Sequence, residues 1–154
     1  MLELRPLCEE DLRDLEGTSY ADMSREEKLA MLRESEEKSH SGSYFEIFAV
    51  CDGDELVGLL NLYAHSKHLI SISPEIRTSL RRKGYGYAAE ELALCFAADR
   101  GYTAAVASVR EDNAASIALH EKLGFETGVC AMTVRGVPIR VMIKTLRPLR
   151  EEKE

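Results

Sequence analysis

Hydrophobic and polar residues alternate along several short stretches of the chain, which is typical of half-buried β-strands. Pro74 lies inside one such stretch and has no backbone N–H, so we expect a bulge or a broken edge there. The dipeptide pattern Asp52-Gly53-Asp54 predicts a tight hairpin between two of the strands. The predicted strands cover residues 2–7, 44–51, 55–63, 69–76, 103–109, 125–134 and 137–146.

Between these strands, apolar residues recur at helical spacing. Ser24 followed by Glu27 is a capping-box pattern that opens one helix, and Asn113 caps another that Gly124 ends. In the short first helix we expect Leu12 and Leu15 to point inward and the acidic residues outward. The predicted helices cover residues 9–16, 25–38, 85–100 and 114–123, and 39–43 reads as a loop.

The order of these elements predicts one mixed α/β domain over residues 1–146, followed by a charged tail at 147–154. Three antiparallel strands come first, and the strand–helix–strand unit from 69 to 109 should make a right-handed parallel crossover. A hairpin turning at Arg135-Gly136 closes the sheet. We therefore expect a twisted, mostly antiparallel sheet flanked by helices.

One junction carries candidate chemistry, namely Arg81-Arg82-Lys83-Gly84-Tyr85-Gly86, called here the glycine loop. It lies between the strand at 69–76 and the helix from 85. The first N–H groups of a helix lack intrahelical partners, and the helix dipole is positive there. Glycines leave room for a ligand against this backbone, and three cations add to the positive field. The loop therefore predicts an anion site, with a diphosphate as its natural ligand.

Three other interpretations compete for this loop. A P-loop requires Gly-Lys-Ser/Thr, whereas Gly86 is followed by Tyr87-Ala88, so that reading fails. The dinucleotide fingerprint Gly84-x-Gly86-x-x-Ala89 is present, with Glu111 as a possible ribose partner. Residues 79–83 separate it from the strand, however, and too few strand–helix–strand units follow. The simplest alternative is a helix start beside a solvated run of charge.

Composition narrows the function classes. The chain has 154 residues and a formal net charge of −7, which opposes general nucleic-acid binding and suits a cationic substrate such as an amine. We expect neither a signal peptide nor a membrane span. The four cysteines are far apart and form no metal motif, so we expect reduced thiols, a cytoplasmic protein and no metal. A catalytic cysteine stays an alternative.

A second block lies downstream, Asn113-x-x-Ser116-x-x-x-His120-x-Lys122-Leu123-Gly124-Phe125. Together with Arg81-x-x-Gly84-x-Gly86, in this order and with one strand between them, it resembles the GCN5-related N-acetyltransferases (GNAT). The resemblance extends to the opening Leu4-Arg5-Pro6 and to the closing hairpin, so it covers essentially the whole chain.

The resemblance implies that the sheet splays between the strands at 69–76 and 103–109 and that acetyl-CoA, the cosubstrate, lies in the gap. Backbone groups of about Glu75 to Arg77 would bond the pantetheine arm, and amides of Arg81 to Tyr87 would hold the pyrophosphate. The implied cofactor-binding residues are Ile76, Arg77, Arg81, Arg82, Lys83, Gly84, Tyr85, Gly86, Tyr87, Asn113 and Ser116.

The resemblance also bears on acid and base. Many members carry a tyrosine at the position of His120 and use it to protonate the departing thiolate. A histidine has a reference pKa of about 6.5 and suits this task, but His120 could equally just pack or hydrogen-bond. Glu75, at the splay point, is the first candidate for the base; Glu46 and His65 are weaker ones.

We therefore expect an acetyl-CoA-dependent N-acetyltransferase in which an amine attacks the thioester directly in a ternary complex. The acceptor is a small-molecule or peptide amine, contacted by the helices at 9–38 and the closing hairpin. Nucleic acid and membranes are not expected partners, whereas a homodimer is. The alternatives are a CoA-binding module without turnover, a structural homo-oligomer that pairs through an edge strand, and the dinucleotide-binding protein.

Overall fold

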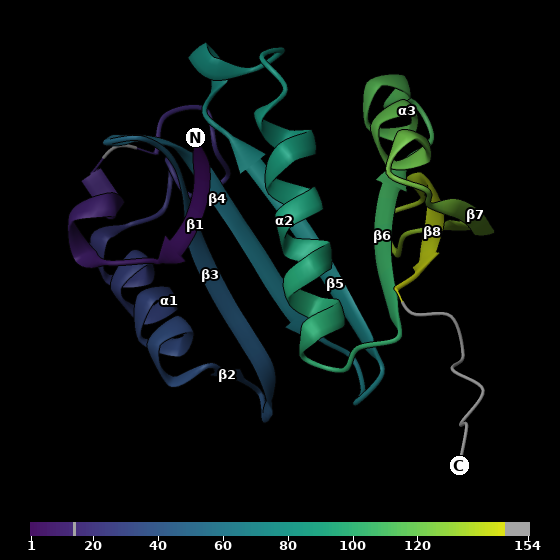
Figure 1. Ribbon diagram of the computed structural model, residues 1–154, viewed down its shortest axis with the longest axis horizontal. Coiled ribbons are helices and arrows are strands. Elements are labelled where there is room, and N and C mark those ends of the chain that lie inside the picture. Colours follow the sequence, from purple (N-terminus) through teal and green to yellow (C-terminus); the bar gives the residue numbers. More distant parts are fainter. Residues whose placement is uncertain (14, 147–154) are drawn as a thin grey trace.

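The computed structural model describes residues 1–13 and 15–146, and the predicted tail at 147–154 lies outside them. In the described residues, one sheet of eight strands runs in the order β1-β3-β4-β5-β6-β8-β7, with β2 paired to β3 (Figure 1). The strands are β1 (Leu2–Pro6), β2 (Ser39–His40), β3 (Ser43–Asp52), β4 (Glu55–Ala64), β5 (Leu69–Ile76), β6 (Ala104–Arg110), β7 (Glu126–Met132) and β8 (Pro138–Thr145).

The predicted strands are confirmed, with bounds that shift by at most two residues. The prediction of a loop at 39–43 is wrong in part, because β2 pairs antiparallel with the start of β3, Ser39 opposite Tyr44. Two positive-φ residues, Ser41 and Gly42, make the turn between them. That pairing is too short for a period-two pattern to reveal it in the sequence.

The helices are η1 (Glu9–Arg13), α1 (Arg25–Glu37), η2 (Thr78–Leu80), α2 (Tyr85–Asp99) and α3 (Ala114–Lys122). Both predicted caps are present: Ser24 and Glu27 form the capping box of α1, and the Asn113 side chain accepts the Ser116 N–H at the start of α3. The first helix is a shorter 3₁₀ turn than predicted. One of its acids also points inward, because Asp11 is buried and paired with Arg5 at 2.7 Å.

Two hydrophobic clusters occupy the two faces of the sheet. Alternate residues of β3 separate them: Ile47 and Ala49 pack with Leu32 of α1, whereas Phe48 and Val50 pack on the α2 side. The α2-side cluster also includes Ile117 of α3. In Figure 1, α2 lies over β4 and β5 while α3 lies over β6 and β8. The helices α2 and α3 therefore share one face, and α1 covers part of the other.

The sheet opens between β5 and β6, as predicted. These strands are parallel and pair only from Leu69 to Ser71, opposite Ala104 to Val106. They start side by side and end far apart (Figure 1). Pro74 lies in the separated part, while its pairing with Leu60 of β4 continues without a register shift. The broken-edge prediction for Pro74 is therefore confirmed, and no bulge accompanies it.

At the far end of the sheet, β7 is an edge strand whose residues are all exposed. Two of its apolar side chains are notable, Val129 at 55% and Met132 at 69% exposed. Within the described residues, no helix has the length and apolar character needed to cross a membrane.

Candidate functional site

The glycine loop turns from η2 into α2 by a left-handed residue. Gly84, the N-cap of α2, has a φ of 84°, a conformation that residues with a Cβ rarely adopt. The first bond of the helix runs from the Ala88 N–H to the Gly84 carbonyl at 3.1 Å. The N–H groups of residues 85–87 precede this bond and so have no intrahelical acceptor. This end of α2 thus offers amides and a positive dipole to an anion.

The cations of the glycine loop have different roles. The Arg81 guanidinium donates to the carbonyl of Ile76 at 3.1 Å and to that of Gly17 at 2.8 Å. Its own N–H donates to Thr78, so Arg81 holds the loop in shape. Arg82 and Lys83 are exposed, and Arg82 has a φ of 65°. A phosphate at this loop would therefore meet backbone first, with exposed side-chain charge around it.

A segment far away in sequence lies against this loop. Besides the Gly17 carbonyl, Glu16 accepts from the Ser79 hydroxyl at 2.6 Å and lies 3.5 Å from the Arg77 guanidinium. At Gly17 the fit is so close that an added Cβ would lie 1.5 Å from the Thr78 hydroxyl. Residues 16–19, called here the N-terminal segment, are thus tied to the strand–loop–helix junction.

The backbone of β5 presents one N–H to the gap beyond its pairing with β6. Backbone groups of a strand alternate between its two neighbours, and the Arg77 N–H donates to Val57 beside β4. The N–H of Ile76 therefore points away from β4, toward the side that β6 has left. Of the predicted stretch from Glu75 to Arg77, Ile76 is the residue whose backbone faces the gap.

A cleft of about 840 Å³ fills the gap and reaches both faces of the sheet. On the α2 side it is lined by Ile72, Ile76 and Leu119, and on the α1 side by Ser71, Ser73, Val106 and Ser108. The glycine loop and the start of α2 form one end, and Asn113, Ser116 and His120 of α3 form the opposite wall. All the residues predicted to hold the cofactor, except Arg77 and Lys83, thus line one cleft.

The predicted α3 face is confirmed in part as a face of the cleft. Ser116 is half-buried, whereas His120 is only 6% exposed. The His120 ring donates from Nδ1 to the Ser116 carbonyl at 2.8 Å, and Nδ1 lies 3.4 Å from the Ser116 hydroxyl. The Phe125 ring lies against the histidine edge to face, at 5.1 Å between centroids. The imidazole is therefore largely buried in this wall, and His120 and Ser116 both line the cleft.

Glu90 of α2 is a site residue that the sequence reasoning missed. Its side chain is fully buried, and Oε2 lies 3.1 Å from Nε2 of His120. Among the described residues, neither carboxylate oxygen has a partner in good hydrogen-bond geometry, so the contact is one of facing charges. Helical spacing could have found it, because Glu90 shares its face with Gly86, Ala93 and Ala97.

This pair changes the acidity of the histidine. Burial lowers the pKa of His120, but the nearby Glu90 carboxylate and the bond to the Ser116 carbonyl together raise it by more. The net result is a pKa above the ordinary value. His120 therefore carries its proton more readily near neutral pH than a free histidine does.

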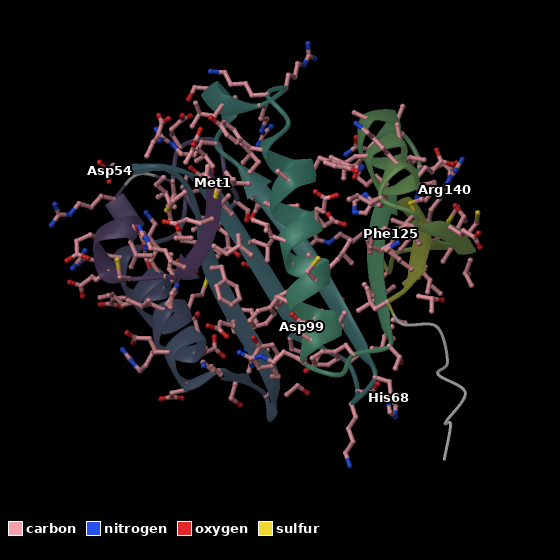
Figure 2. All side chains as sticks on the ribbon, in the orientation of Figure 1. Met1, Asp54, His68, Asp99, Phe125 and Arg140 are labelled. Carbon is pink, nitrogen blue, oxygen red and sulfur yellow. The ribbon has the colours of Figure 1, made fainter. Side chains whose placement is uncertain are left out.

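Two tyrosines of the predicted cofactor set have side-chain partners. The Tyr85 hydroxyl donates to Asp52 at 2.7 Å, which ties the start of α2 to the β3–β4 hairpin. The ammonium of Lys122 lies 4.6 Å from the centre of the Tyr87 ring. Together with the Glu90–His120 pair, this contact joins α2 to α3 where the sheet leaves them unsupported. Side chains fill the space between the two helices in Figure 2.

The three candidate bases lie in different places. Glu75 shares the α1 side of β5 with Ser71 and Ser73, and its carboxylate accepts from the N–H and the hydroxyl of Ser19 at 3.0 and 2.7 Å. Glu46 is buried on β3 and accepts the Tyr44 hydroxyl at 2.8 Å. His65 is exposed and contacts the Ser71 hydroxyl at the edge of the cleft. None of the three candidates is among the residues that line the cleft.

The α1 face of the sheet also contains an unpaired group, which lies outside the cleft lining. The Asn61 side chain donates to the Tyr20 hydroxyl, and its Oδ1 is buried without a hydrogen-bond partner in the described residues. Asn61 lies directly opposite Ser73 across the β4–β5 pair, so both belong to the same face. This face thus combines a free carbonyl oxygen with hydroxyls and, at Glu75, a carboxylate.

Comparison with known proteins agrees with this geometry. The family model described as Acetyltransferase (GNAT) domain matches residues 1–126. No curated protein matches the chain.

Several solved structures share the fold. An N-acetyltransferase from Staphylococcus aureus Mu50 has a TM-score of 0.77 at 19% identity, over 96% of this chain and 99% of that one. A putative acetyltransferase from Salmonella typhimurium, solved with acetyl-CoA, has a TM-score of 0.76 at 16% identity, over 99% and 98%. An acetyltransferase from Salmonella typhimurium that modifies the N-terminal serine of ribosomal protein L7/L12 has a TM-score of 0.78 at 18% identity, over 94% of each chain.

Proposed function

Because the chain belongs to the GNAT acetyltransferase family, we propose that it is an acetyl-CoA-dependent N-acetyltransferase that transfers the acetyl group directly to a primary amine. The observation that carries this proposal is the cleft between β5 and β6, which passes from one face of the sheet to the other. Such a passage lets an acyl donor enter from the α2 side and an acceptor from the α1 side. Two substrates held side by side need no covalent enzyme intermediate.

The residues present fit acetyl-CoA at one end of the cleft. The amides of residues 85–87 and the exposed charges of Arg82 and Lys83 suit a diphosphate. Gly86 leaves the backbone open, because a Cβ there would meet only Ile76 and Leu119, both at 3.8 Å. The pantetheine arm would lie along β5, past Asn113 and Ser116. The N–H of Ile76 would then polarise the thioester carbonyl.

Acid and base are assigned to opposite sides of the sheet. Glu75 lies on the acceptor side, where it is oriented by Ser19. We assign to it the removal of a proton from the attacking amine, directly or through water. His120 lies in the opposite wall of the cleft, and we assign to it the proton for the departing thiolate. The position of the two groups on opposite sides of the sheet supports this assignment.

The acceptor is a small-molecule or peptide amine. The acceptor side offers Asn61 Oδ1, the hydroxyls of Ser71 and Ser73, and Glu75, which are all groups that accept hydrogen bonds from an amine. The net charge of −7 favours the approach of cations. We further propose that the protein is cytoplasmic and dimeric, with the exposed strand β7 as the shared edge.

Two measurements test the proposal. Thermal shift is first recorded with acetyl-CoA, CoA, NAD and ATP, because a ligand that binds the folded state raises the melting temperature. We expect acetyl-CoA and CoA to stabilise the protein. Free thiol is then followed with acetyl-CoA and a panel that contains polyamines, amino acids, aminoglycosides and short peptides.

Each rival gives a different result. Stabilisation by NAD alone would favour a dinucleotide-binding protein. Stabilisation by acetyl-CoA without thiol release from any amine would favour a CoA-binding module, a reading supported by the missing tyrosine at position 120. One efficiently acetylated amine excludes that module.

A further inference from the structure

The buried pair between α2 and α3 continues to the wall of the cleft as a line of three side chains. Glu90 faces Nε2 of His120 at 3.1 Å, and Nδ1 of the same ring lies 3.4 Å from the Ser116 hydroxyl. Only Ser116 of the three is half-exposed. We propose that these residues form a proton relay in which Ser116 delivers the proton to the leaving group, His120 replenishes it and Glu90 positions the charged imidazole. This inference rests on the proposed function and adds residues to it.

Stability alone does not explain this pair. Glu90 is fully buried and His120 is 6% exposed, so both charges are removed from water. A buried ion pair contributes little net stability, and well-packed apolar residues often do as well in its place. The surrounding helix face is built of small apolar residues such as Ala89 and Ala93, which could accept such a replacement. Two ionisable groups in this place point to proton chemistry instead.

The contacts of the His120 ring determine which of its nitrogens carries a proton toward which partner. A carbonyl can only accept, so the 2.8 Å contact with the Ser116 carbonyl places a proton on Nδ1 of His120. The Glu90 carboxylate favours a second proton on Nε2. The imidazolium therefore presents its Nδ1–H to the Ser116 carbonyl, with the Ser116 hydroxyl 3.4 Å from the same nitrogen, while Nε2 faces the buried carboxylate. Both side chains line the cleft, and Ser116 is the more exposed of the two.

The groups around His120 leave Glu90 as its charged partner. From α3, the ring faces Ser116, and from the segment after α3 it faces the Phe125 ring at 5.1 Å. From α2 it faces Glu90. The next cation on α3, Lys122, lies over the Tyr87 ring. Within the described residues, no other charged group shifts the pKa of His120.

The step balances as a single proton transfer through two groups. The amine nitrogen forms a bond to the acetyl carbon, and the carbon–sulfur bond breaks with its electron pair on sulfur. The Ser116 hydroxyl gives its proton to the sulfur and takes one from Nδ1 of His120. The imidazole is left neutral, and its proton returns from water after the products leave. Glu90 neither gives nor takes a proton in this step.

The first experiment measures the histidine directly and requires no acceptor. The chain has four histidines, and the His120 signal is identified by its loss in His120→Gln. Its titration midpoint is measured by NMR in the native protein, in Glu90→Gln and in the neighbouring exposed control Glu91→Gln. We expect Glu90→Gln to lower the midpoint by about one pH unit or more, and Glu91→Gln to leave it unchanged. A midpoint that does not respond to Glu90→Gln overturns the inference.

The second experiment separates delivery from folding and binding. Ser116→Ala removes the hydroxyl but keeps the backbone N–H that Asn113 caps at 3.1 Å, so α3 is preserved. With an amine that the native protein acetylates, we expect thiol release to fall at least about tenfold when both substrates are saturating, with the His120 midpoint unchanged. Ser116→Thr restores a hydroxyl and should recover most of the rate.

The pH profile gives the last readout. In the native protein, the alkaline limb of kcat should follow the His120 midpoint, and in Glu90→Gln both should move to lower pH together. If the native protein acetylates an amine and both Ser116→Ala and Glu90→Gln release thiol at the native rate, the relay is wrong and the proposed function stands. If the native protein binds acetyl-CoA but acetylates no amine, both fail together.

Discussion

Oε2 of Glu90 lies 3.1 Å from Nε2 of His120, and this contact joins α2 to α3 at the point where the sheet between them is open. Elsewhere in the fold, strand pairing holds neighbouring elements together. Between β5 and β6 the pairing ends at Ser71 and Val106, and side chains of the two helices take its place. The two walls of the cleft are thus joined by a buried contact between two ionisable side chains, Glu90 and His120.

This contact predicts a specific pH dependence of stability. The pKa of His120 is raised in the folded state, so its protonation favours folding. The stability it contributes is fully present below the unfolded-state pKa of about 6.5 and is lost as pH rises through the folded-state pKa. We expect the free energy of unfolding of the native protein, relative to His120→Gln, to fall as pH rises above about 6.5. Urea unfolding of both proteins measures it.

The matched control for this experiment is His68→Gln, because His68 is exposed in a turn. Its difference from the native protein should not follow the same course. A native advantage over His120→Gln that grows with pH would contradict the raised pKa.

The glycine loop should depend on its backbone more than on its charges. A Cβ at Gly86 meets ordinary contacts at 3.8 Å and has a φ that a helix accepts, so Gly86→Ala should keep or slightly raise stability. Its methyl group would nevertheless project into the cleft and weaken acetyl-CoA binding by about tenfold or more. Gly84→Ala, at a φ of 84°, should in addition lose about 1–2 kcal/mol of stability.

Arg82→Ala is the comparison, since it removes one exposed charge without changing a glycine. We expect a smaller loss of affinity that shrinks further at high salt. Calorimetric titration of each variant with acetyl-CoA at two ionic strengths measures these affinities. If Arg82→Ala loses far more affinity than both glycine variants at physiological salt, side chains hold the anion and the backbone cradle is wrong.

We expect Arg81 to hold the N-terminal segment, residues 16–19, in place, and to contribute little to anion binding through its charge. Its guanidinium bonds to Gly17 and Ile76, and the nearby Ser19 N–H donates to Glu75. Removing two hydrogen bonds of about 1 kcal/mol each should loosen residues 16–19 and speed amide exchange at Ser19 about fivefold or more. Hydrogen exchange at the Ser19 amide is compared between Arg81→Ala and the control Arg82→Ala. The native Arg82 side chain makes neither of these two hydrogen bonds, so its removal should not loosen the segment. Equal exchange in the two variants would show that Arg81 does not hold the segment.

The exposed edge of β7 predicts self-association. Val129 and Met132 are 55% and 69% exposed on a strand with one free side. We expect a dimer by light scattering, and Met132→Lys should shift it toward monomer at micromolar concentration. Leu92→Lys, which alters an exposed leucine on α2 at 40% exposure, should leave the dimer intact. A native protein that is monomeric throughout would contradict the assignment.

Local chemistry explains why so much of the fold could be predicted. The capping box of Ser24 and Glu27, the Asn113 cap and the Asp52–Asp54 hairpin each act within four residues, so the sequence displays them directly. Pro74 likewise marks the strand that loses a partner. Two motifs in order then connected these elements to one family.

The contacts that shape the site could not be predicted in the same way. Arg81 bonds to Gly17 across 64 positions, and Glu90 meets His120 only because the sheet opens beneath them. Such pairings depend on the packing of distant elements, which periodicity does not encode. The residue type gave a partial signal, since a glutamate on the buried face of α2 requires a partner. Its identity had to come from the structure.

Pro74 has a further consequence for anything that lies along β5. Beyond the pairing with β6, the backbone N–H groups on the open side would belong to positions 74 and 76, and proline leaves only that of Ile76. A normal strand edge repeats every two residues, so an extended guest can slide along it and find equivalent bonds. On this described stretch of β5 there is no second equivalent position. An extended guest shifted by two residues along β5 would find no backbone N–H to bond to. This edge therefore allows a single register.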